Sequence, residues 1–211
     1  MSNVRKLKLD DNTGGLKEEI TEFKRRRIRE EACHLFYLHG YESATIDAIA
    51  QRLDVTKPFI YSYYKNKSEL LYDLCKLGIA LSLEAIDEAT ANNKTPGEQL
   101  KLLIDRVARI IIDYQEYIVV YVREEKNLAS DQARKIRQQR NLFDHRLGEL
   151  LERGQNAGEF SVDDPVLTAT TIGGMMTWVA LWYSPAGTRT ETEIITHVMS
   201  MIESAVSTAT P

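Results

Sequence analysis

Cysteine, histidine and long apolar runs are all scarce in this sequence of 211 residues. Its two cysteines, Cys33 and Cys75, fall in amphipathic helical patterns. No apolar block of a signal peptide follows the basic residues near the N-terminus, so we expect two buried thiols and no disulfide. No cysteine or histidine cluster has metal-ligand spacing, and no stretch approaches the ~18 apolar residues of a membrane span. These absences predict a cytoplasmic protein without a metal site.

Motifs of catalysis are missing as well. The sequence contains no G-x-S-x-G nucleophile turn, no H-E-x-x-H zinc motif and no glycine-rich phosphate loop. The four histidines are scattered through helical segments without a partner motif. Gly173-Gly174 lies inside an apolar helix, where close approach of two helices explains the glycines better than a phosphate site. We therefore expect neither enzymatic activity nor a bound cofactor.

Charge is distributed unevenly along the chain. Residues 1–72 contain 13 Lys and Arg against 11 Asp and Glu, a balance of +2. The remaining residues contain 14 against 20, a balance of −6, and the whole chain carries −4. A slightly basic head on an acidic body suits a protein that touches phosphates at one end only.

The segment 45–71, TIDAIAQRLDVTKPFIYSYYKNKSELL, carries the clearest functional pattern. It predicts a helix capped by Thr45, a turn at Asp54-Val55, and a second short helix opened by Thr56 and Pro58. The second helix is rich in lysine, tyrosine and hydroxyl side chains that its few apolar residues do not bury. A short helix of this composition, held by a helix packed across it, is what reading the major groove of DNA requires.

The same segment resembles the DNA-binding domain of TetR-type repressors, whose pattern is roughly T-x-x-x-I-A-x-x-x-x-V-[ST]-x-x-x-x-Y-x-[YH]-[FY]-x-x-K-x-x-L. The matching residues are Thr45, Ile49, Ala50, Val55, Thr56, Tyr61, Tyr63, Tyr64, Lys67 and Leu70, preceded by Phe36, Gly40 and Tyr41. The resemblance implies a helix-turn-helix regulator with an effector-binding body. A helical bundle with some surface tyrosines is the alternative interpretation of this segment.

Eight residues of the segment are candidates for contact with double-stranded operator DNA. We expect Thr45 and Thr56, at helix N-termini, to bond phosphates, and Tyr61 and Lys67 to clamp the same strand. The positions most able to reach base edges are Lys57, Phe59, Ser62 and Tyr63. In this assignment Lys57 reads a guanine and Phe59 contacts a thymine methyl group.

The apolar periodicity predicts an all-α fold, with a three-helix head and a body of about six helices. We expect a flexible arm over residues 1–20, whose basic side chains either reach along DNA or belong to a plain disordered tail. The DNA-binding domain then spans residues 21–67, and the effector-binding and dimerisation domain spans residues 68–211. The first helix, 21–39, is expected to bury Phe23, Ile28, Ala32, Leu35 and Phe36. Further helices are expected at 66–91, 96–127 with a break near 115–116, 130–157, 165–183 and 190–207.

The body holds more aromatic, methionine and arginine side chains than packing alone needs. The candidates for a ligand cavity are Tyr114, Tyr117, Tyr121, Arg123, Arg146, Met175, Trp178 and Trp182. Their apolar members suit an acyl or ring portion of a ligand, and the arginines suit an anionic group. A packed core with solvated arginines is the alternative. A cavity lined by Glu124 and Glu125 would instead favour a neutral or cationic drug-like compound.

The end of the chain is similar to one TetR-type subgroup in particular. Its W-x-x-x-W-Y-x-P-x-G pattern is formed here by Trp178, Trp182, Tyr183, Pro185 and Gly187. Subgroup members resemble regulators of lipid, steroid and aromatic-acid degradation, several of which respond to acyl-CoA thioesters. The resemblance implies a repressor that a small effector, with an acyl-CoA thioester as the leading hypothesis, releases from a palindromic operator. The alternatives are a multidrug-responsive repressor of an efflux gene and a helical interaction protein that does not bind DNA.

We also expect a homodimer, because one short recognition helix forms only a small interface with DNA. The helices at 165–183 and 191–207 are the candidates for the dimer surface, since they carry more apolar residues than one core needs. The residues expected on that surface are Ile172, Met176, Val179, Ile195, Val198, Met199 and Ile202.

Overall fold

The computed structural model describes residues 13–207, and within this range the protein is helical apart from an isolated β-bridge between Phe160 and Ser207. The head consists of α1 (Thr13–Ser43), α2 (Ile46–Arg52) and α3 (Lys57–Tyr61). The body consists of α4 (Lys67–Thr90), α5 (Pro96–Asp113), α6 (Gln115–Glu124), the short 3₁₀ helix η1 (Glu125–Asn127), α7 (Ser130–Asn156), α8 (Pro165–Trp182) and α9 (Glu191–Val206). The predicted all-α fold is confirmed. The break expected near residues 115–116 falls at Tyr114.

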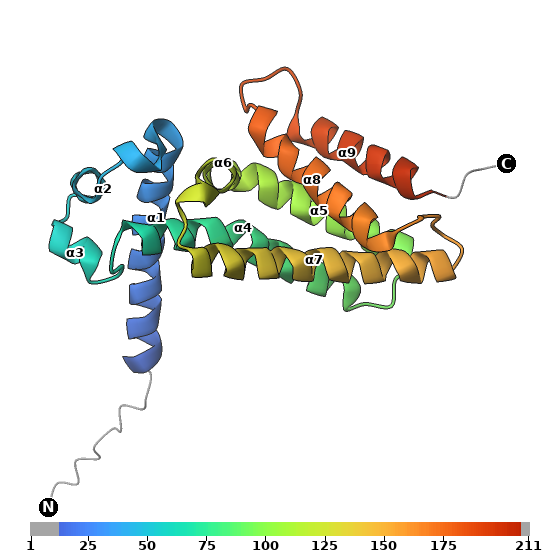
Figure 1. Cartoon of the computed structure of the whole chain (residues 1–211), viewed down its shortest axis with the longest axis horizontal. Coiled ribbons are helices and arrows are strands. Elements are labelled where there is room, and N and C mark those ends of the chain that lie inside the picture. The colour runs from blue at the N-terminus through green and yellow to red at the C-terminus, as the bar shows by residue number, and fades with distance from the viewer. Residues whose placement is uncertain (1–12, 208–211) are drawn as a thin grey trace, which may run out of the picture.

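The body helices α4 and α7 run along the long axis of the molecule, α6 is seen nearly end-on, and α1 lies across one end (Figure 1). α4 starts beside α3 and extends along the body next to α7, while α5 returns in the opposite direction (Figure 1). α8 packs on α7 and α5, and α9 covers α5. None of the helices in residues 13–207 is both long and apolar enough to cross a membrane.

Two apolar cores follow the division into head and body. The body core is built by α4 to α9, with Leu103, Leu150 and Ile202 among its fully buried side chains. The head core includes Ile28 and Ile60 but does not end at residue 67, since further members are Leu70, Leu71, Leu74, Val120, Leu128 and Ile136. These later residues belong to helices that continue into the body, or lie between them, so head and body are joined by rigid elements. The boundary between domains at residues 67 and 68 stays a prediction.

Local sequence signals explain how α2 and α3 are placed. Thr45 caps α2 by accepting a hydrogen bond from the Ala48 N–H at 3.1 Å, as predicted. The chain then turns at Asp54, whose φ of 53° lies in the left-handed region that aspartate tolerates better than most residues. Thr56 occupies the cap position of α3 without a side-chain capping bond in the described structure, and Asn66 caps α4.

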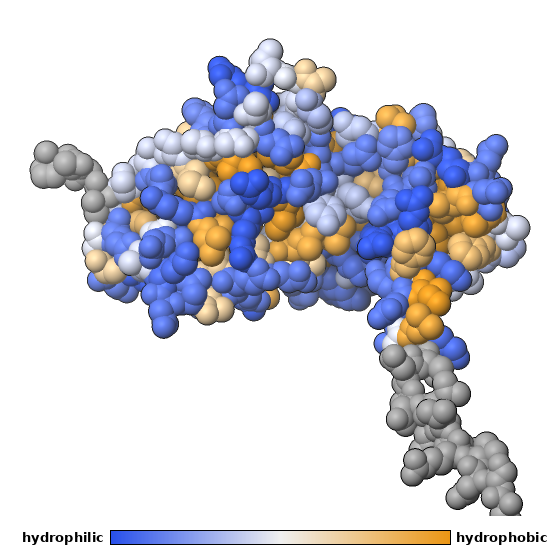
Figure 2. Space-filling model, turned by 180° about the vertical axis from the view of Figure 1, so that it is seen from behind, coloured by the Kyte–Doolittle hydropathy of each residue, from blue (hydrophilic) through white to orange (hydrophobic). Residues whose placement is uncertain are grey.

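The start of α1 corrects the prediction of a flexible arm. The helix begins at Thr13, eight residues before the predicted start, whereas residues 1–12 lie outside the described range. Leu16, Ile20 and Phe23 recur at helical spacing but are exposed, so Phe23 does not mark a buried side as expected. Apolar surface is visible at this projecting start of α1 (Figure 2). Because the segment extends a packed helix and needs no nucleus of its own, it stays helical without burial.

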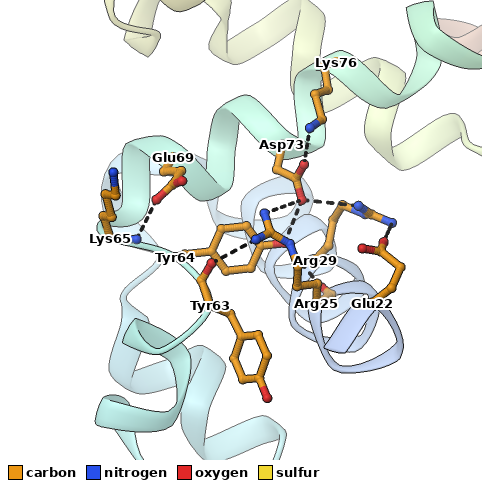
Figure 3. A network of polar contacts seen from close by, with 9 residues as sticks. All are labelled: Glu22, Arg25, Arg29, Tyr63, Tyr64, Lys65, Glu69, Asp73 and Lys76. Carbon is orange, nitrogen blue, oxygen red and sulfur yellow. Dashed lines mark hydrogen bonds and ion pairs between the residues drawn. The ribbon is translucent and has the colours of Figure 1, made fainter. Parts of the chain in front are cut away.

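A buried carboxylate fastens α4 to α1 and to the residues after α3 (Figure 3). Asp73, only 4% exposed, accepts hydrogen bonds from Tyr64 Oη at 2.7 Å and Arg29 Nη1 at 3.2 Å. Lys76 Nζ lies 2.7 Å from its other oxygen, and Arg25 joins the group at 3.8 Å while donating to the Tyr63 carbonyl. Burial alone would raise the pKa of Asp73, but the hydrogen bonds from Lys76 and Tyr64 and the charges of Lys76 and Arg29 hold this pKa below its usual value.

We predict that Asp73→Asn lowers the free energy of unfolding by about 3 kcal/mol, because half-buried Arg29 keeps only the more distant Glu22 as a counter-charge and the buried Asp73 site loses its charge. Denaturant unfolding at neutral pH measures this difference. Asp105→Asn, which breaks an ion pair with Arg109 on a single helix, is the matched control and should change stability by less than about 0.5 kcal/mol. Equal losses in both variants would contradict a special role for Asp73.

The lowered pKa of Asp73 predicts that the stability of the protein depends on pH. Since the folded-state pKa of Asp73 is lowered, the stability that this carboxylate contributes is fully present above its unfolded pKa of about 3.9. It is lost as the pH falls through the lower, folded-state pKa. The stability gap between the wild type and Asp73→Asn should therefore be widest near neutral pH and shrink below pH ~4.

Candidate nucleic-acid interface and ligand cavity

The short helix α3 is anchored on one side and open on the other. Ile60 and Tyr64 are fully buried in the head core and fix its position. Five of the eight predicted DNA contacts are exposed: Thr45, Thr56, Lys57, Tyr61 and Ser62. Their hydroxyl, phenol and ammonium groups are available for hydrogen bonds with phosphates and base edges.

Lys57, at the start of α3, is held by a carboxylate of the preceding helix. Its Nζ lies 2.8 Å from Asp47 Oδ2, and both side chains face solvent. The hydrogen bond and the charge of Asp47 raise the pKa of Lys57, so this side chain stays positive. The ammonium has two further donors, so Lys57 can contact a base from within this pair or after leaving Asp47.

Phe59 and Tyr63 are less available than the sequence suggested. Both are half-buried, and their ring centroids are 5.2 Å apart. The Lys24 ammonium of α1 lies 5.8 Å from the Phe59 ring, which adds a cation that the sequence analysis missed at this surface. Four basic residues in a row, 24–27, gave no sign of which one faces α3.

Lys67, the first residue of α4, holds the end of α1 in this DNA-free structure. Its Nζ donates to the carbonyls of Tyr41, Glu42 and Ala44 at 2.7, 3.3 and 3.0 Å, and it lies 4.2 Å from the Tyr41 ring centroid. An ammonium group has three donors, and all three are directed at these carbonyls. The predicted phosphate contact of Lys67 stays a prediction and would compete with this structural role.

A cavity of about 500 Å³ lies inside the body, where helices α4 to α8 meet. Its apolar wall includes Ile79, Val107, Ile111, Ile118, Phe143, Met176 and Leu181. Its polar groups include Ser82, Tyr121, Glu125, Arg140, Asp144, Thr170 and Thr177. This size and mixture are typical of a site for a small ligand.

Only Tyr121 and Trp178, of the eight predicted ligand residues, line this cavity. Tyr114 and Tyr117 pack edge to face on another side of α6, and burial raises the pKa of Tyr117. Arg123 lies over the Tyr37 ring of α1, and Arg146 pairs with Asp87. Met175 packs against the body core, and Trp182 is exposed at the end of α8. Both sides of α6 carry aromatic residues, so the sequence did not show which side faces the cavity.

Arg140 is the arginine that lines the cavity. Its Nη1 donates to Tyr121 Oη at 3.1 Å, and Thr170 Oγ1 donates to Asp144 nearby at 3.0 Å. Arg134 and Arg137 precede it on the same helix, are exposed, and make no ion pair or hydrogen bond in residues 13–207. Other body arginines are paired with carboxylates, as in Arg106–Glu88 and Arg109–Asp105. The cavity lining therefore combines Arg140 with two carboxylates, Glu125 and Asp144, and the unpaired arginines lie nearer the start of α7.

The residues that line the cavity give little support for a reactive thiol or a metal site. Cys75 lines the cavity, but burial raises the pKa of its thiol to about 12, so it is not a reactive thiolate at neutral pH. Cys33 is likewise a buried free thiol, as predicted. Across the described residues, no group of three or more His, Cys, Asp or Glu side chains is placed to hold a metal ion.

The residues predicted to form a dimer surface lie instead in the core. Ile172, Met176, Val179, Ile195, Val198 and Ile202 are buried, and Met199 is half-buried. α8 and α9 do expose other apolar side chains, namely Leu167, Trp178, Trp182 and Met201. A surface hollow of about 700 Å³ lies between Trp182 and α9. The assignment of faces was wrong because α8 is apolar nearly all round, which hides its buried side in the sequence.

Two family models match this chain. Residues 28–74 match the model described as bacterial regulatory proteins, tetR family. Residues 93–206 match the model described as tetracyclin repressor-like, C-terminal domain. Together they cover the head from the middle of α1 onward, the start of α4 and most of the body.

Solved structures and curated relatives agree with these matches. The TetR-family regulator PfmR from Thermus thermophilus is 26% identical, with a TM-score of 0.78 over 84% of this chain and 97% of PfmR. AibR, solved in complex with isovaleryl coenzyme A and operator DNA, is 23% identical, with a TM-score of 0.73 over 84% of this chain and 96% of AibR.

Among the curated relatives, the HTH-type transcriptional repressor KstR of Rhodococcus jostii (strain RHA1) is 30% identical over 88 residues, which are 41% of this chain and 40% of KstR. The chain spans about two fifths of the length of the curated relatives it matches. With a helix-turn-helix head, an effector-sized cavity in a helical body and both family models matched in order, the chain belongs to the TetR family of bacterial transcriptional regulators.

Proposed function

We propose that this protein is a ligand-responsive repressor, which binds a palindromic operator as a homodimer and leaves it when a small effector fills the cavity. One observation carries this proposal: α4 belongs to both sites. Leu70 and Leu74 pack in the head core, while Gly78 and Ser82 of the same helix line the cavity. A ligand that shifts this wall of the cavity therefore shifts the head.

The effector needs only a modest preference for one state. In a dimer, a small rotation of each head changes the distance between the two recognition helices, which must match the spacing of the half-sites. A differential affinity of a few kcal/mol between the matched and mismatched states is enough to release the operator. Regulation of this kind takes place wherever operator DNA is, which in a bacterial cell is the cytoplasm.

For the effector, we propose an acyl-CoA thioester of a degradation intermediate. The apolar wall suits an acyl or ring portion, and about 500 Å³ is enough for that portion alone. Arg140, with Arg137 and Arg134 farther along α7, replaces the predicted Arg123 and Arg146 as the partner of the phosphate-bearing part outside the cavity. The crystallised complex of AibR with isovaleryl coenzyme A favours the thioester, and the repressor name of KstR favours repression.

A multidrug-type effector is the second candidate, since Glu125 and Asp144 also line the cavity. Glu124, the other carboxylate considered for a drug-like cation, instead accepts a hydrogen bond from the Tyr41 N–H of α1. The two carboxylates that remain would favour a cationic compound if Arg140 were turned outward.

We predict that Lys57→Ala weakens operator binding by ~1–3 kcal/mol and relaxes the sequence preference at one base pair, because a base-reading lysine is lost. Binding to operator variants and to random DNA, measured by gel shift, tests this. Lys94→Ala, at an exposed lysine between α4 and α5, is the control. Equal losses on operator and random DNA for Lys57→Ala would show that this residue contacts phosphate only.

We predict that isovaleryl-CoA or a longer acyl-CoA releases the operator in a gel shift, whereas the free acid and free CoA do not. Arg140→Ala should raise the thioester concentration needed by about tenfold, because hydrogen bonds to charged groups contribute ~1.5 kcal/mol or more. Arg146→Ala, whose guanidinium is paired with Asp87, should leave that concentration unchanged. Release by only the free acid or a drug-like cation would exclude the thioester.

We predict that Trp182→Glu converts the dimer into a monomer at micromolar concentration, as measured by light scattering. The exposed face of α8 would be buried against its symmetry mate, and a buried carboxylate without a partner is unfavourable there. Leu142→Glu is the matched control, because Leu142 is also exposed but lies on α7. A wild-type protein that is monomeric and still binds the operator would contradict the proposed assembly.

A further inference from the structure

The last residue of α6, Glu124, holds the end of α1. Its Oε1 accepts a hydrogen bond from the Tyr41 N–H at 3.2 Å, and its Oε2 accepts one from Asn127 Nδ2 at 2.8 Å. The carbonyl of Tyr41 in turn accepts a hydrogen bond from Lys67 Nζ at 2.7 Å. The backbone of Tyr41 therefore lies between a carboxylate of the body and the ammonium that follows α3.

A kink in α1 makes this arrangement possible. Gly40 has φ 77° and ψ 160°, so the regular helix is interrupted one residue before Tyr41. The interruption frees the Tyr41 N–H from its place in the helix and points it to Glu124. Lys67 also bonds the carbonyls of Glu42 and Ala44, which precede α2. Glu124, the Tyr41 backbone and Lys67 thus connect α6 to the residues before and after the helix-turn-helix.

The same turn of α6 that carries Glu124 also forms cavity wall. Tyr121 and Val122 line the cavity, and Glu125, the next residue, lines it as well. Glu124 itself points the other way, to α1. Because these residues share one helical turn, pressure on the cavity side displaces the carboxylate on the α1 side.

We propose that Glu124 is a positioning residue that transmits cavity occupancy to the recognition helix, through the Tyr41 backbone and Lys67. This inference rests on the proposed function and names the route by which its effector acts. α4 already connects one wall of the cavity to the head core. Glu124 provides a second connection, because it follows the α6 residues that form another wall and it holds the end of α1. Glu124 touches neither the ligand nor the DNA in this scheme.

A substitution that imitates the ligand tests the route without any effector. A Cβ added at Gly78 would collide with Ile118 Cδ1, the tip of a side chain of α6 that lines the cavity. Ile118 can yield to a Cβ alone, but the two further methyl groups of Gly78→Val fill this part of the cavity and press on α6. This variant should bind the operator about tenfold more weakly than the wild type, within the usual range of allosteric coupling. Adding Glu124→Ala to Gly78→Val should restore most of that affinity. Val122→Phe, which enlarges another side chain of α6 that lines the cavity, replaces Gly78→Val if the latter does not fold.

Three controls make the result specific. Glu124→Ala alone should change operator affinity less than about threefold, a shift of under ~0.7 kcal/mol. Glu124→Gln keeps an oxygen that accepts the Tyr41 N–H, so Gly78→Val should still weaken binding in that background. Glu116→Ala removes a different contact between α6 and α1, with His34 at 3.1 Å, and should not restore affinity.

A second measurement does not depend on DNA or ligand. Hydrogen exchange of the Tyr41 amide should be about tenfold faster in Glu124→Ala than in the wild type, because its acceptor is removed. It should stay near the wild-type rate in Gly78→Val, because the bond must remain intact to carry the displacement. Fast exchange in Gly78→Val, unchanged exchange in Glu124→Ala, or equal rescue of operator binding by Glu116→Ala and Glu124→Ala would overturn the proposed route. Failure of the wild type to bind an operator would refute the proposed function instead, and the exchange measurement would still decide the role of Glu124.

Discussion

The buried carboxylate of Asp73 is the interaction on which the rest of the structure depends. Asp73 lies on α4 and contacts the Tyr64 phenol, which follows α3, and two arginines of α1. It therefore joins α1, α4 and the segment after α3 at one point. The free energy of a buried charge depends strongly on the positions of its partners, because their attraction offsets its desolvation and is lost when any of them moves. The recognition helix therefore has one preferred placement relative to α4. A regulator needs such a placement before a ligand can change it.

The cavity and the head share helices, so few elements separate them. α4 runs from the Asp73 cluster into the cavity wall, and α6 carries cavity residues on one side and contacts to α1 on the other. Side chains in close-packed cores do not deform smoothly, so a small shift at the cavity would favour a second arrangement of the head instead of fading with distance. Val120 and Ile136, which belong to body helices but pack in the head core, extend this continuity.

The sequence predicted the helices and the DNA-binding motif well, because capping residues, glycines and apolar periodicity are local signals. Thr45 and Pro165 lie at the helix starts predicted from them, and Gly40 kinks α1 where a helix end was predicted, although the helix continues to Ser43. The lining of the cavity was predicted poorly, because only Tyr121 and Trp178 of the eight predicted residues lie along it. Which side of α6 or α8 faces inward depends on the packing of distant helices, and both carry apolar or aromatic residues on several sides. Arg140 was not predicted because no local sequence signal distinguishes it from the other arginines of α7. The Asp73 cluster joins residues more than 40 positions apart, which no spacing rule reveals.

The ion pair between Lys57 and Asp47 has a consequence for how the protein searches DNA. Binding to non-cognate DNA is driven mainly by the release of counterions from phosphates, so each free lysine on the surface slows dissociation from the wrong sequence. Asp47, 2.8 Å from the Lys57 ammonium, offsets part of that attraction at the start of α3. A base contact by Lys57 would therefore be made in competition with Asp47, and the pair would lower the attraction of this surface for non-cognate DNA.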